Sequence, residues 1–248
     1  MADIHIGLSG FSYKHWQGPG RFYPEGLKPK EFLRYYATRF RAVELDGIWY
    51  RLPTKETVQS WIDQTPFHFR FAPKAHRTIT HLQRLKPEAL SFVHALLERL
   101  DSLRTTGRLG PILLQLPPNL RRDDDRLGTF LGHLPTDVRW AVEFRHASWS
   151  AREVETVLRT HGIAWAAVDT DESQAERRNT ADFCYVRMRR SDYVEKALEE
   201  WAGWLKQQAV QGTECFVFFK HEDEGSSWIW ADQLTEIIGN SRERSASS

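Results

Sequence analysis

The chain has 248 residues, of which 41% are hydrophobic and 27% charged, as expected for a globular protein with a sizeable core. Its formal net charge of +1 gives no long-range attraction to nucleic acid or to an anionic membrane. No run reaches the roughly 20 apolar residues that span a bilayer, and the N-terminus lacks the features of a signal peptide. We therefore expect a cytoplasmic protein with no membrane partner.

Apolar runs alternate with helical patterns along the first half of the chain. In order, we predict a strand at 4–8, a helix at 30–40, a strand at 42–46, a helix at 54–64 capped by Thr54, a strand at 67–72, a helix at 87–105 and a strand at 111–116.

The second half continues the alternation. We predict a helix at 123–133, a strand at 140–144, a helix at 151–159 capped by Ser148 or Ser150, a strand at 163–168, a loop at 172–181, a strand at 183–188, a helix at 192–209, a strand at 214–219 and a helix at 228–238 that stops at Gly239. Cys184 and Cys215 lie in apolar strands without CxxC spacing, which favours buried reduced thiols.

Eight strands alternating with helices over about 240 residues predict an α/β fold, a single (β/α)8 TIM-type barrel. The alternative is an open doubly wound sheet, which the absence of a Gly-x-Gly-x-x-Gly loop disfavours. We expect one domain over residues 1–240 and a disordered tail over 241–248.

The chemistry is predicted where the strands end. The strand at 140–144 is followed by Arg145 and His146 and carries Glu143 at its end. Such a cluster is also compatible with salt bridges that only anchor a strand. The same pattern recurs on nearly every strand, and the C-terminal strand ends of a barrel share one mouth. We expect that mouth to hold Ser9, Tyr13, Glu44, Asp46, Lys74, His76, Gln115, Glu143, Arg145, His146, Asp169, Asp171, Arg187, Arg189, Lys220, His221, Glu222 and Asp223.

Several motifs resemble the YecE-like family, domain of unknown function 72, over nearly the whole chain. They include Gly7-x-Ser9-Gly10-Phe11-x-Tyr13-x-x-Trp16, Phe71-Ala72-x-Lys74, Ile79-Thr80-His81, Gln115-Leu116-Pro117-Pro118 and Val142-Glu143-Phe144-Arg145-His146-x-Ser148-Trp149. The resemblance implies a TIM-type barrel but no settled activity, with a loose relation to sugar isomerases.

The chain also departs from the family's pattern. It carries Asp46-Gly47 where relatives usually have two asparagines, and Arg189-Arg190 where His-Gly is common. Lys220-His221 replaces a second pair of asparagines. These changes alter the polarity of the expected pocket.

The first functional hypothesis is an enzyme that acts on a small anionic or sugar-like ligand, without a metal or other cofactor. Glu143 and Glu44 form the expected acid/base pair, with His146, His81 or His221 as alternatives. Cationic side chains suit a phosphate or carboxylate, and aromatic and amide groups suit the rest of a ligand. The expected binding residues are Tyr13, Trp16, Lys74, Gln115, Arg145, Trp149, Arg187 and Lys220.

Two other hypotheses stay open. A metal-dependent isomerase or nuclease would use Glu44, Glu143, Asp169 and His221 as ligands, although no local metal motif supports it. A module that binds nucleic acid or protein without catalysis would stack bases on Tyr13, Trp16, Trp49 and Trp149. The near-zero net charge disfavours nucleic acid.

Overall fold

The computed structural model describes residues 1–220 and 227–246, with side chains described up to residue 239. All strand pairs are parallel and form two sheets. The first has the order β3-β2-β1-β9-β8-β7, and the second has the order β4-β5-β6. The strands are β1 (Ile4–Ser9), β2 (Ala42–Leu45), β3 (Arg70–Pro73), β4 (Ile112–Gln115), β5 (Trp140–Glu143), β6 (Ala164–Trp165), β7 (Ala167–Asp169), β8 (Phe183–Met188) and β9 (Glu214–Phe219).

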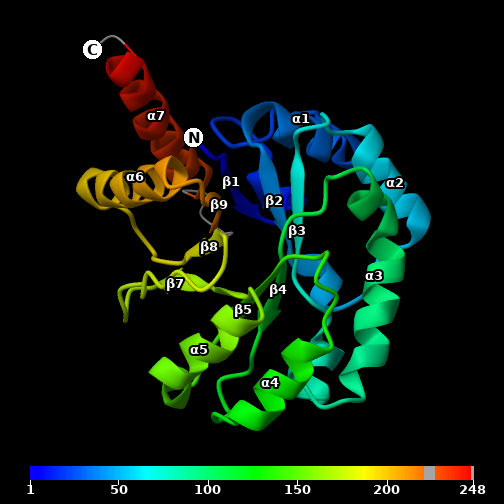
Figure 1. The fold of residues 1–248 in the computed structure, drawn as a ribbon. Helices are drawn as coiled ribbons and strands as arrows, with labels where there is room; N and C mark the ends of the chain where they lie inside the picture. Colours follow the sequence, from blue (N-terminus) through cyan, green and yellow to red (C-terminus); the bar gives the residue numbers. More distant parts are fainter. Residues whose placement is uncertain (221–226, 247–248) are drawn as a thin grey trace.

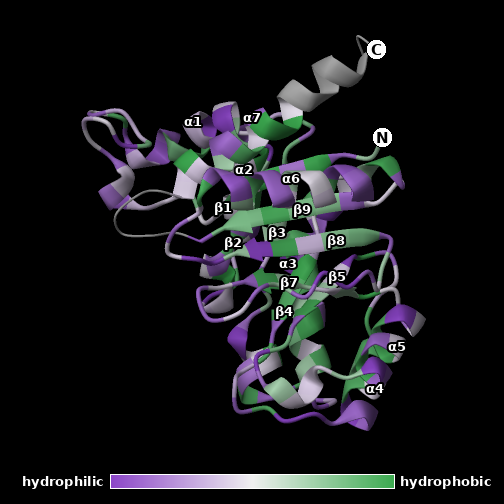
Figure 2. Cartoon of the chain, turned by 90° about the vertical axis from the view of Figure 1, so that its left-hand side faces the viewer, coloured by the Kyte–Doolittle hydropathy of each residue, from purple (hydrophilic) through white to green (hydrophobic). Residues whose placement is uncertain are grey.

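Helices surround the strands, which lie at the centre of the molecule (Figure 1). They are α1 (Phe32–Arg39), α2 (Lys55–Asp63), α3 (Ala89–Thr105), α4 (Asp124–Gly132), α5 (Arg152–Thr160), α6 (Glu195–Val210) and α7 (Ser227–Ala246). Hydrophobic residues follow the strands, whereas the outer helices and loops carry hydrophilic ones (Figure 2). Within the described residues, no helix is both long enough and apolar enough to cross a membrane.

The two sheets meet at both of their edges. Isolated bridges join Phe71 to Leu109 and Lys74 to Leu113, which brings β3 next to β4. At the other edge, Ala166 separates β6 from β7, and its N–H donates to the Val142 carbonyl of β5. The predicted strand at 163–168 is therefore two short strands, because the chain leaves β5 at Trp165 and pairs with β8 from Ala167 onward.

A second, separate hydrophobic cluster, which we call the strand core, consists almost entirely of strand residues, and those that come from the same strand are two positions apart. It combines small residues on β2, β3, β5 and β6 with aromatic residues on β8 and β9, and consists of Ala42, Ala72, Leu113, Ala141, Ala164, Ala166, Phe183, Tyr185, Phe216 and Phe218. We call the strand face that carries these residues the inner face. Successive strand side chains point to opposite sides, so the next inner-face position on most strands lies at its C-terminal end.

Two glycines allow close approach beside the inner face. A Cβ on Gly7 would lie 1.9 Å from the Ala42 carbonyl oxygen, so only glycine fits between β1 and β2 there. The Tyr36 hydroxyl accepts from Leu8 N–H and donates to that same oxygen. Gly10 has a φ of +85°, which turns the chain so that the Tyr13 hydroxyl reaches the Ser9 carbonyl.

The ends of two helices and the two cysteines can be compared with the predictions, as can the cap of α2. Thr54 caps α2 by accepting from Thr57 N–H at 3.2 Å, as predicted, and Cys184 and Cys215 are buried free thiols. The predicted caps of α5 are wrong, because the residue before α5 is Ala151, whose methyl group cannot cap. The predicted stop at Gly239 is also wrong, since α7 continues to Ala246. A glycine inside a helix costs only about 1 kcal/mol relative to alanine.

Candidate functional site

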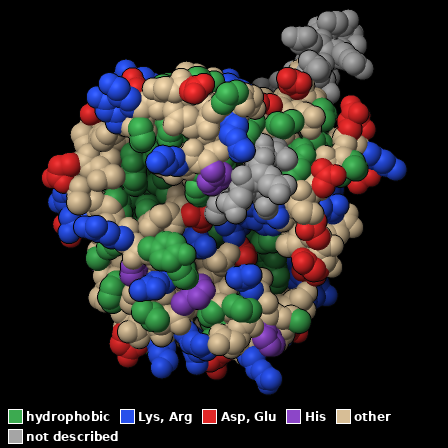
Figure 3. All heavy atoms as spheres, turned by 180° about the vertical axis from the view of Figure 1, so that it is seen from behind, with side chains coloured by type: hydrophobic (Ala, Val, Ile, Leu, Met, Phe, Trp, Pro, Cys, Tyr) green, Lys and Arg blue, Asp and Glu red, His purple; other side chains and the backbone are tan. Residues whose placement is uncertain are grey.

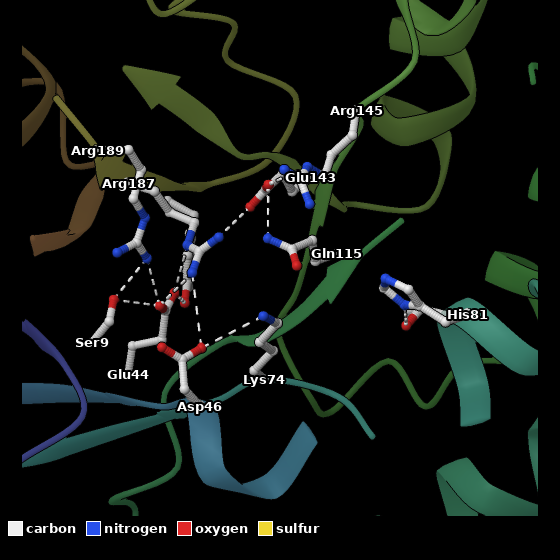
Figure 4. Close-up of polar contacts among 12 residues, drawn as sticks. Ser9, Glu44, Asp46, Lys74, His81, Gln115, Glu143, Arg145, Arg187 and Arg189 are labelled. Atoms are coloured by element: carbon white, nitrogen blue, oxygen red, sulfur yellow. Dashed lines mark hydrogen bonds and ion pairs between the residues drawn. The ribbon is translucent and has the colours of Figure 1, made fainter. Parts of the chain in front are cut away.

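Six polar side chains lie on the inner face at the C-terminal ends of the strands. Five of them lie two positions after a residue of the strand core, namely Glu44, Lys74, Gln115, Glu143 and Arg187, and the sixth is Ser9 at the end of β1. Two contacts among them follow from strand register, because Ser9 pairs with Glu44 and Gln115 pairs with Glu143. The convergence of these strand ends, predicted from sequence, is confirmed by the hydrogen bonds that join them (Figure 4).

Arg187 occupies the centre of this cluster and contacts two carboxylates. Its Nε and Nη2 donate to Glu44 at 2.9 and 2.7 Å, and its Nη1 donates to Glu143 Oε2 at 2.5 Å. All three side chains are buried. β8 adjoins neither β2 nor β5, so the guanidinium crosses the space between strands from both sheets. A planar guanidinium suits this role because it can bind two carboxylates at once.

Glu44 is held by a complete set of donors. Besides Arg187, it accepts from Arg189 at 2.7 Å, from the Ser9 hydroxyl at 2.6 Å and from the Tyr185 hydroxyl at 2.7 Å. Burial alone would raise the pKa of Glu44, but the charges of Arg187 and Arg189 outweigh it and hold that pKa well below its usual range. This carboxylate is therefore a poor proton acceptor near neutral pH. The acid/base role of Glu44 stays a prediction, while its observed contacts hold the Arg187 guanidinium in place.

Glu143 differs from Glu44 because it reaches a cavity. Its Oε1 accepts from Gln115 Nε2 at 2.8 Å and lies 3.8 Å from Arg145 Nε. The cavity has a volume of about 670 Å³, and its polar lining includes Gln115, Glu143, Arg145, His146, Glu176, Arg187 and Arg189. We call it the arginine cavity. On the face shown in Figure 3, basic and acidic side chains lie together near the centre.

The predicted site residues between 145 and 149 lie in different environments. Arg145 is 49% exposed and lines the arginine cavity, where it is available to a ligand. His146 also lines it, with Nδ1 accepting from Ser148 N–H at 3.1 Å. In the neutral form, a His146 ring that accepts at Nδ1 carries its proton on Nε2, which can then donate a hydrogen bond. Trp149, in contrast, is buried and donates to the Leu120 carbonyl at 2.7 Å.

Trp149 and Trp16 were predicted to bind a ligand, but both are buried in the core. Both rings are core residues, with Trp16 packed against Phe22 and Trp149 stacked on Phe144. Tyr13 is only partly buried and lines a second cavity of about 550 Å³, together with Asp46, Leu52 and other residues after β1 and β2. The Tyr13 hydroxyl donates to the Ser9 carbonyl at 3.0 Å. Tyr13 therefore stays a candidate for ligand contact, whereas the two tryptophans do not.

Lys74 and Asp46 lie near Arg187, below it in the view of Figure 4. Lys74 Nζ is 3.7 Å from Asp46 Oδ1 and 5.3 Å from the Trp49 ring centre. Burial is the main cause that lowers the pKa of Lys74, and Arg187 adds to it, while Asp46 opposes it. His81 lies beyond Lys74 and Gln115, and burial together with Lys74 lowers its pKa as well.

Asp169 does not join the cluster. It is fully buried and accepts from Trp201 Nε1 at 3.2 Å and from Arg190 at 2.9 Å. The reason is strand alternation: Ala164 and Ala166 are on the inner face, so Asp169 points outward to α6. The predicted metal ligands Glu44, Glu143 and Asp169 are therefore not brought together, and His221 lies outside the described residues. Among residues 1–220 and 227–239, no group of three or more His, Cys, Asp or Glu could hold a metal ion.

Lys220 follows β9, and its N–H donates to the Met188 carbonyl at the end of β8. Glu222 and Asp223, also predicted at the mouth, lie outside the described residues. Tyr185 has no predicted role, yet its hydroxyl donates to Glu44 Oε2 at 2.7 Å. Its position two residues before Arg187 was the signal that could have revealed it, since both must face the same side of β8.

Parallel strands with outer helices define an α/β protein, and its strand C-termini carry the polar cluster described above. The chain belongs to the family described as "Protein of unknown function DUF72", whose profile matches residues 5–248. The resemblance found in the sequence is thereby confirmed.

Relatives and solved structures agree with this assignment. The UPF0759 protein YunF of Bacillus subtilis is 22% identical over 281 aligned residues, covering 95% of this chain and 94% of the relative. The UPF0759 protein YecE of Escherichia coli K12 is 32% identical over 161 residues, covering 64% of this chain and 55% of the relative. A DUF72 family protein of Thermotoga maritima has a TM-score of 0.79 at 27% identity and covers 96% of this chain and 99% of its own. Another, from Enterococcus faecalis, has a TM-score of 0.76 at 18% identity, with coverage of 96% and 98%.

Proposed function

We propose that this protein is an enzyme that acts on a small anionic or sugar-like molecule in the arginine cavity, by acid/base chemistry at Glu143. The observation that carries the proposal is the contrast between the two glutamates bound to Arg187. Glu44 is saturated with donors and fully buried, whereas Glu143 presents its carboxylate to a cavity lined by three arginines. One glutamate orients the arginine, and the other is left facing a ligand.

The proposal includes a closed eight-stranded barrel, in which β6 and β7 act as one strand. Its support is the contact across both edges of the two sheets, through the bridges from β3 to β4 and through Ala166. The strand core draws on β2 to β6, β8 and β9 together, and Arg187 joins a strand of one sheet to a strand of the other. Side chains from both sheets that fill one interior are typical of a barrel of this size.

The lining of the arginine cavity suits an anion. Arg145, Arg187 and Arg189 outnumber the carboxylates of Glu143 and Glu176, and guanidinium groups match the geometry of phosphate and carboxylate. Gln115, Ser150, Thr170, Ser173 and Gln174 add amide and hydroxyl groups that can bind the hydroxyls of a sugar.

Glu143 is held in one orientation by the side chains around it. Its Oε2 accepts from Arg187 at 2.5 Å, and its Oε1 accepts from Gln115 at 2.8 Å and lies 3.8 Å from Arg145 Nε. A carboxylate fixed in the lining of the arginine cavity is placed to exchange a proton with a bound ligand.

A thermal-shift screen of phosphosugars, nucleotides and sugar acids tests the proposal, followed by turnover assays on each compound that raises Tm. Glu143→Gln preserves shape and hydrogen bonding, so we expect it to keep ligand binding and lower kcat by about 10²–10⁴-fold. Arg145→Ala removes an exposed cation and should weaken binding instead. Glu98→Gln, on the surface of α3, is the matched control and should change neither quantity.

Two results would go against the proposal. Turnover that survives Glu143→Gln would remove Glu143 from the chemistry. Ligands that bind without any turnover would favour the hypothesis of a binding module without catalysis. A gel shift that weakens with salt would then identify nucleic acid, rather than protein, as the partner.

A further inference from the structure

Lys74 is a partly buried amine without a hydrogen-bonded partner among the described residues. Its side chain is 14% exposed, and the nearest carboxylate oxygen, Asp46 Oδ1, lies at 3.7 Å, beyond hydrogen-bond range. The face of Trp49 covers it at 5.3 Å from the ring centre. A lysine that serves only as a structural ion pair usually contacts its carboxylate directly, and this one does not.

The groups around Lys74 also have unused hydrogen-bonding capacity. Asp46 Oδ1 is buried and has no hydrogen-bond partner within the described part of the chain. Three N–H groups of Arg187 donate to Glu44 and Glu143. A guanidinium has five, so two stay without an acceptor among residues 1–220 and 227–239. Arg187 Nη2 lies 3.8 Å from the same Asp46 oxygen, so an amine, a carboxylate and a guanidinium lie close together (Figure 4).

The electrostatic surroundings favour the neutral amine more than those of a surface lysine do. Burial lowers the pKa of Lys74, and the Arg187 guanidinium adds to this effect. A desolvated lysine next to another cation is a recognised form of activated nucleophile.

We infer that Lys74 is a nucleophile that forms an imine with a small carbonyl compound bearing an acidic group, of the 2-oxo acid class. The inference rests on the proposed function and specifies its substrate class. Lys74 and Asp46 do not line the arginine cavity themselves, but Arg187 lines it and lies next to Asp46. The two unused N–H groups of Arg187 would bind the acidic group next to the carbonyl, and Asp46 would accept the proton that the amine releases.

The reaction balances without an oxidant or reductant. The lone pair of the neutral amine attacks the carbonyl carbon, and the carbonyl oxygen takes up a proton to give a carbinolamine. The nitrogen then loses its remaining proton, the C–O bond breaks, and water leaves as the C=N bond forms. The sum is one amine and one carbonyl compound giving one imine and one water.

Reductive trapping tests this inference. The full chain is incubated at pH 7 with pyruvate and cyanoborohydride, whose hydride converts the imine to a stable secondary amine, and the adduct is located by peptide mass spectrometry. We expect one adduct per chain at Lys74, formed faster than at Lys55, because burial lowers the pKa of Lys74 and Arg187 lies close enough to hold the carboxylate of pyruvate. Lys55 is 60% exposed on α2 and serves as the internal reference.

Variants and a competitor sharpen the test. Lys74→Arg keeps the positive charge but cannot form an imine, so the adduct should disappear while urea unfolding shows an intact fold. Lys55→Arg should retain the Lys74 adduct, and malonate, an anion without a ketone, should slow its formation. Adducts spread evenly over surface lysines would overturn the inference. If malonate raises Tm and no adduct forms, the imine is wrong although the anion site of the proposed function stands.

Discussion

Replacing Arg187 by methionine should be among the most destabilising single changes in this site. The guanidinium is buried and donates to Glu44 twice and to Glu143 once. Methionine has a similar length but no charge, so both carboxylates stay buried after losing their shared cation. Glu44 keeps Arg189, Ser9 and Tyr185, whereas Glu143 keeps only Gln115 as a hydrogen-bond donor within the described residues.

The magnitude follows from the cost of an uncompensated buried charge. Removing one partner of a buried ion pair costs about 3–5 kcal/mol, much more than the net value of the intact pair. We therefore expect Arg187→Met to lower the free energy of unfolding by about 3–5 kcal/mol. Adding Glu44→Gln and Glu143→Gln to the same chain removes the stranded charges, so the triple variant should lose much less than the sum of its single changes.

Urea unfolding at pH 7, followed by the fluorescence of the ten tryptophans, measures these differences. Arg159→Met is the matched control, because Arg159 is 56% exposed and pairs with Glu155 on the surface of α5. Its change should stay within about 0.5 kcal/mol. A loss below about 1 kcal/mol for Arg187→Met, or strict additivity in the triple variant, would show that Arg187 does not compensate the two carboxylates.

Three other predictions concern neighbouring features. The pKa of Glu44 is lowered in the folded state, so the charged carboxylate stabilises the fold above its ordinary pKa of about 4.3, and this stabilisation is lost in acid. Glu44→Gln should therefore lower the free energy of unfolding at pH 7. In urea unfolding at lower pH, the difference from wild type should become smaller. Burial raises the pKa of Glu214, but His5 and Arg139 outweigh it and bring that pKa to about 2; acid titration monitored by circular dichroism should show Glu214→Gln removing a loss of stability between about pH 4 and 2. Trp149→Phe leaves the Leu120 carbonyl without its donor and should lower the free energy of unfolding by about 1–3 kcal/mol. If the variant also loses the Tm increase that a ligand causes in the wild type, Trp149 contributes to ligand binding after all.

Much of the fold could be predicted from the sequence because it depends on local patterns. Apolar runs such as 183–188 and 214–219 became β8 and β9 with the predicted bounds. Thr54 caps α2 because its hydroxyl needs only a backbone N–H three residues away. The gathering of Glu44, Glu143 and Arg187 also followed from sequence, since parallel strands with helical crossovers bring their C-terminal ends to one edge.

What each polar side chain does was decided by tertiary structure. Glu44 and Glu143 look alike in the sequence, yet one is enclosed by four donor residues and the other faces a cavity, because their neighbours come from distant strands. Trp149 follows a polar segment but is buried against Leu120, 29 residues away. Local sequence sets which residues end a strand, whereas burial and charge pairing depend on contacts between distant segments, and those contacts determine which groups remain free to react.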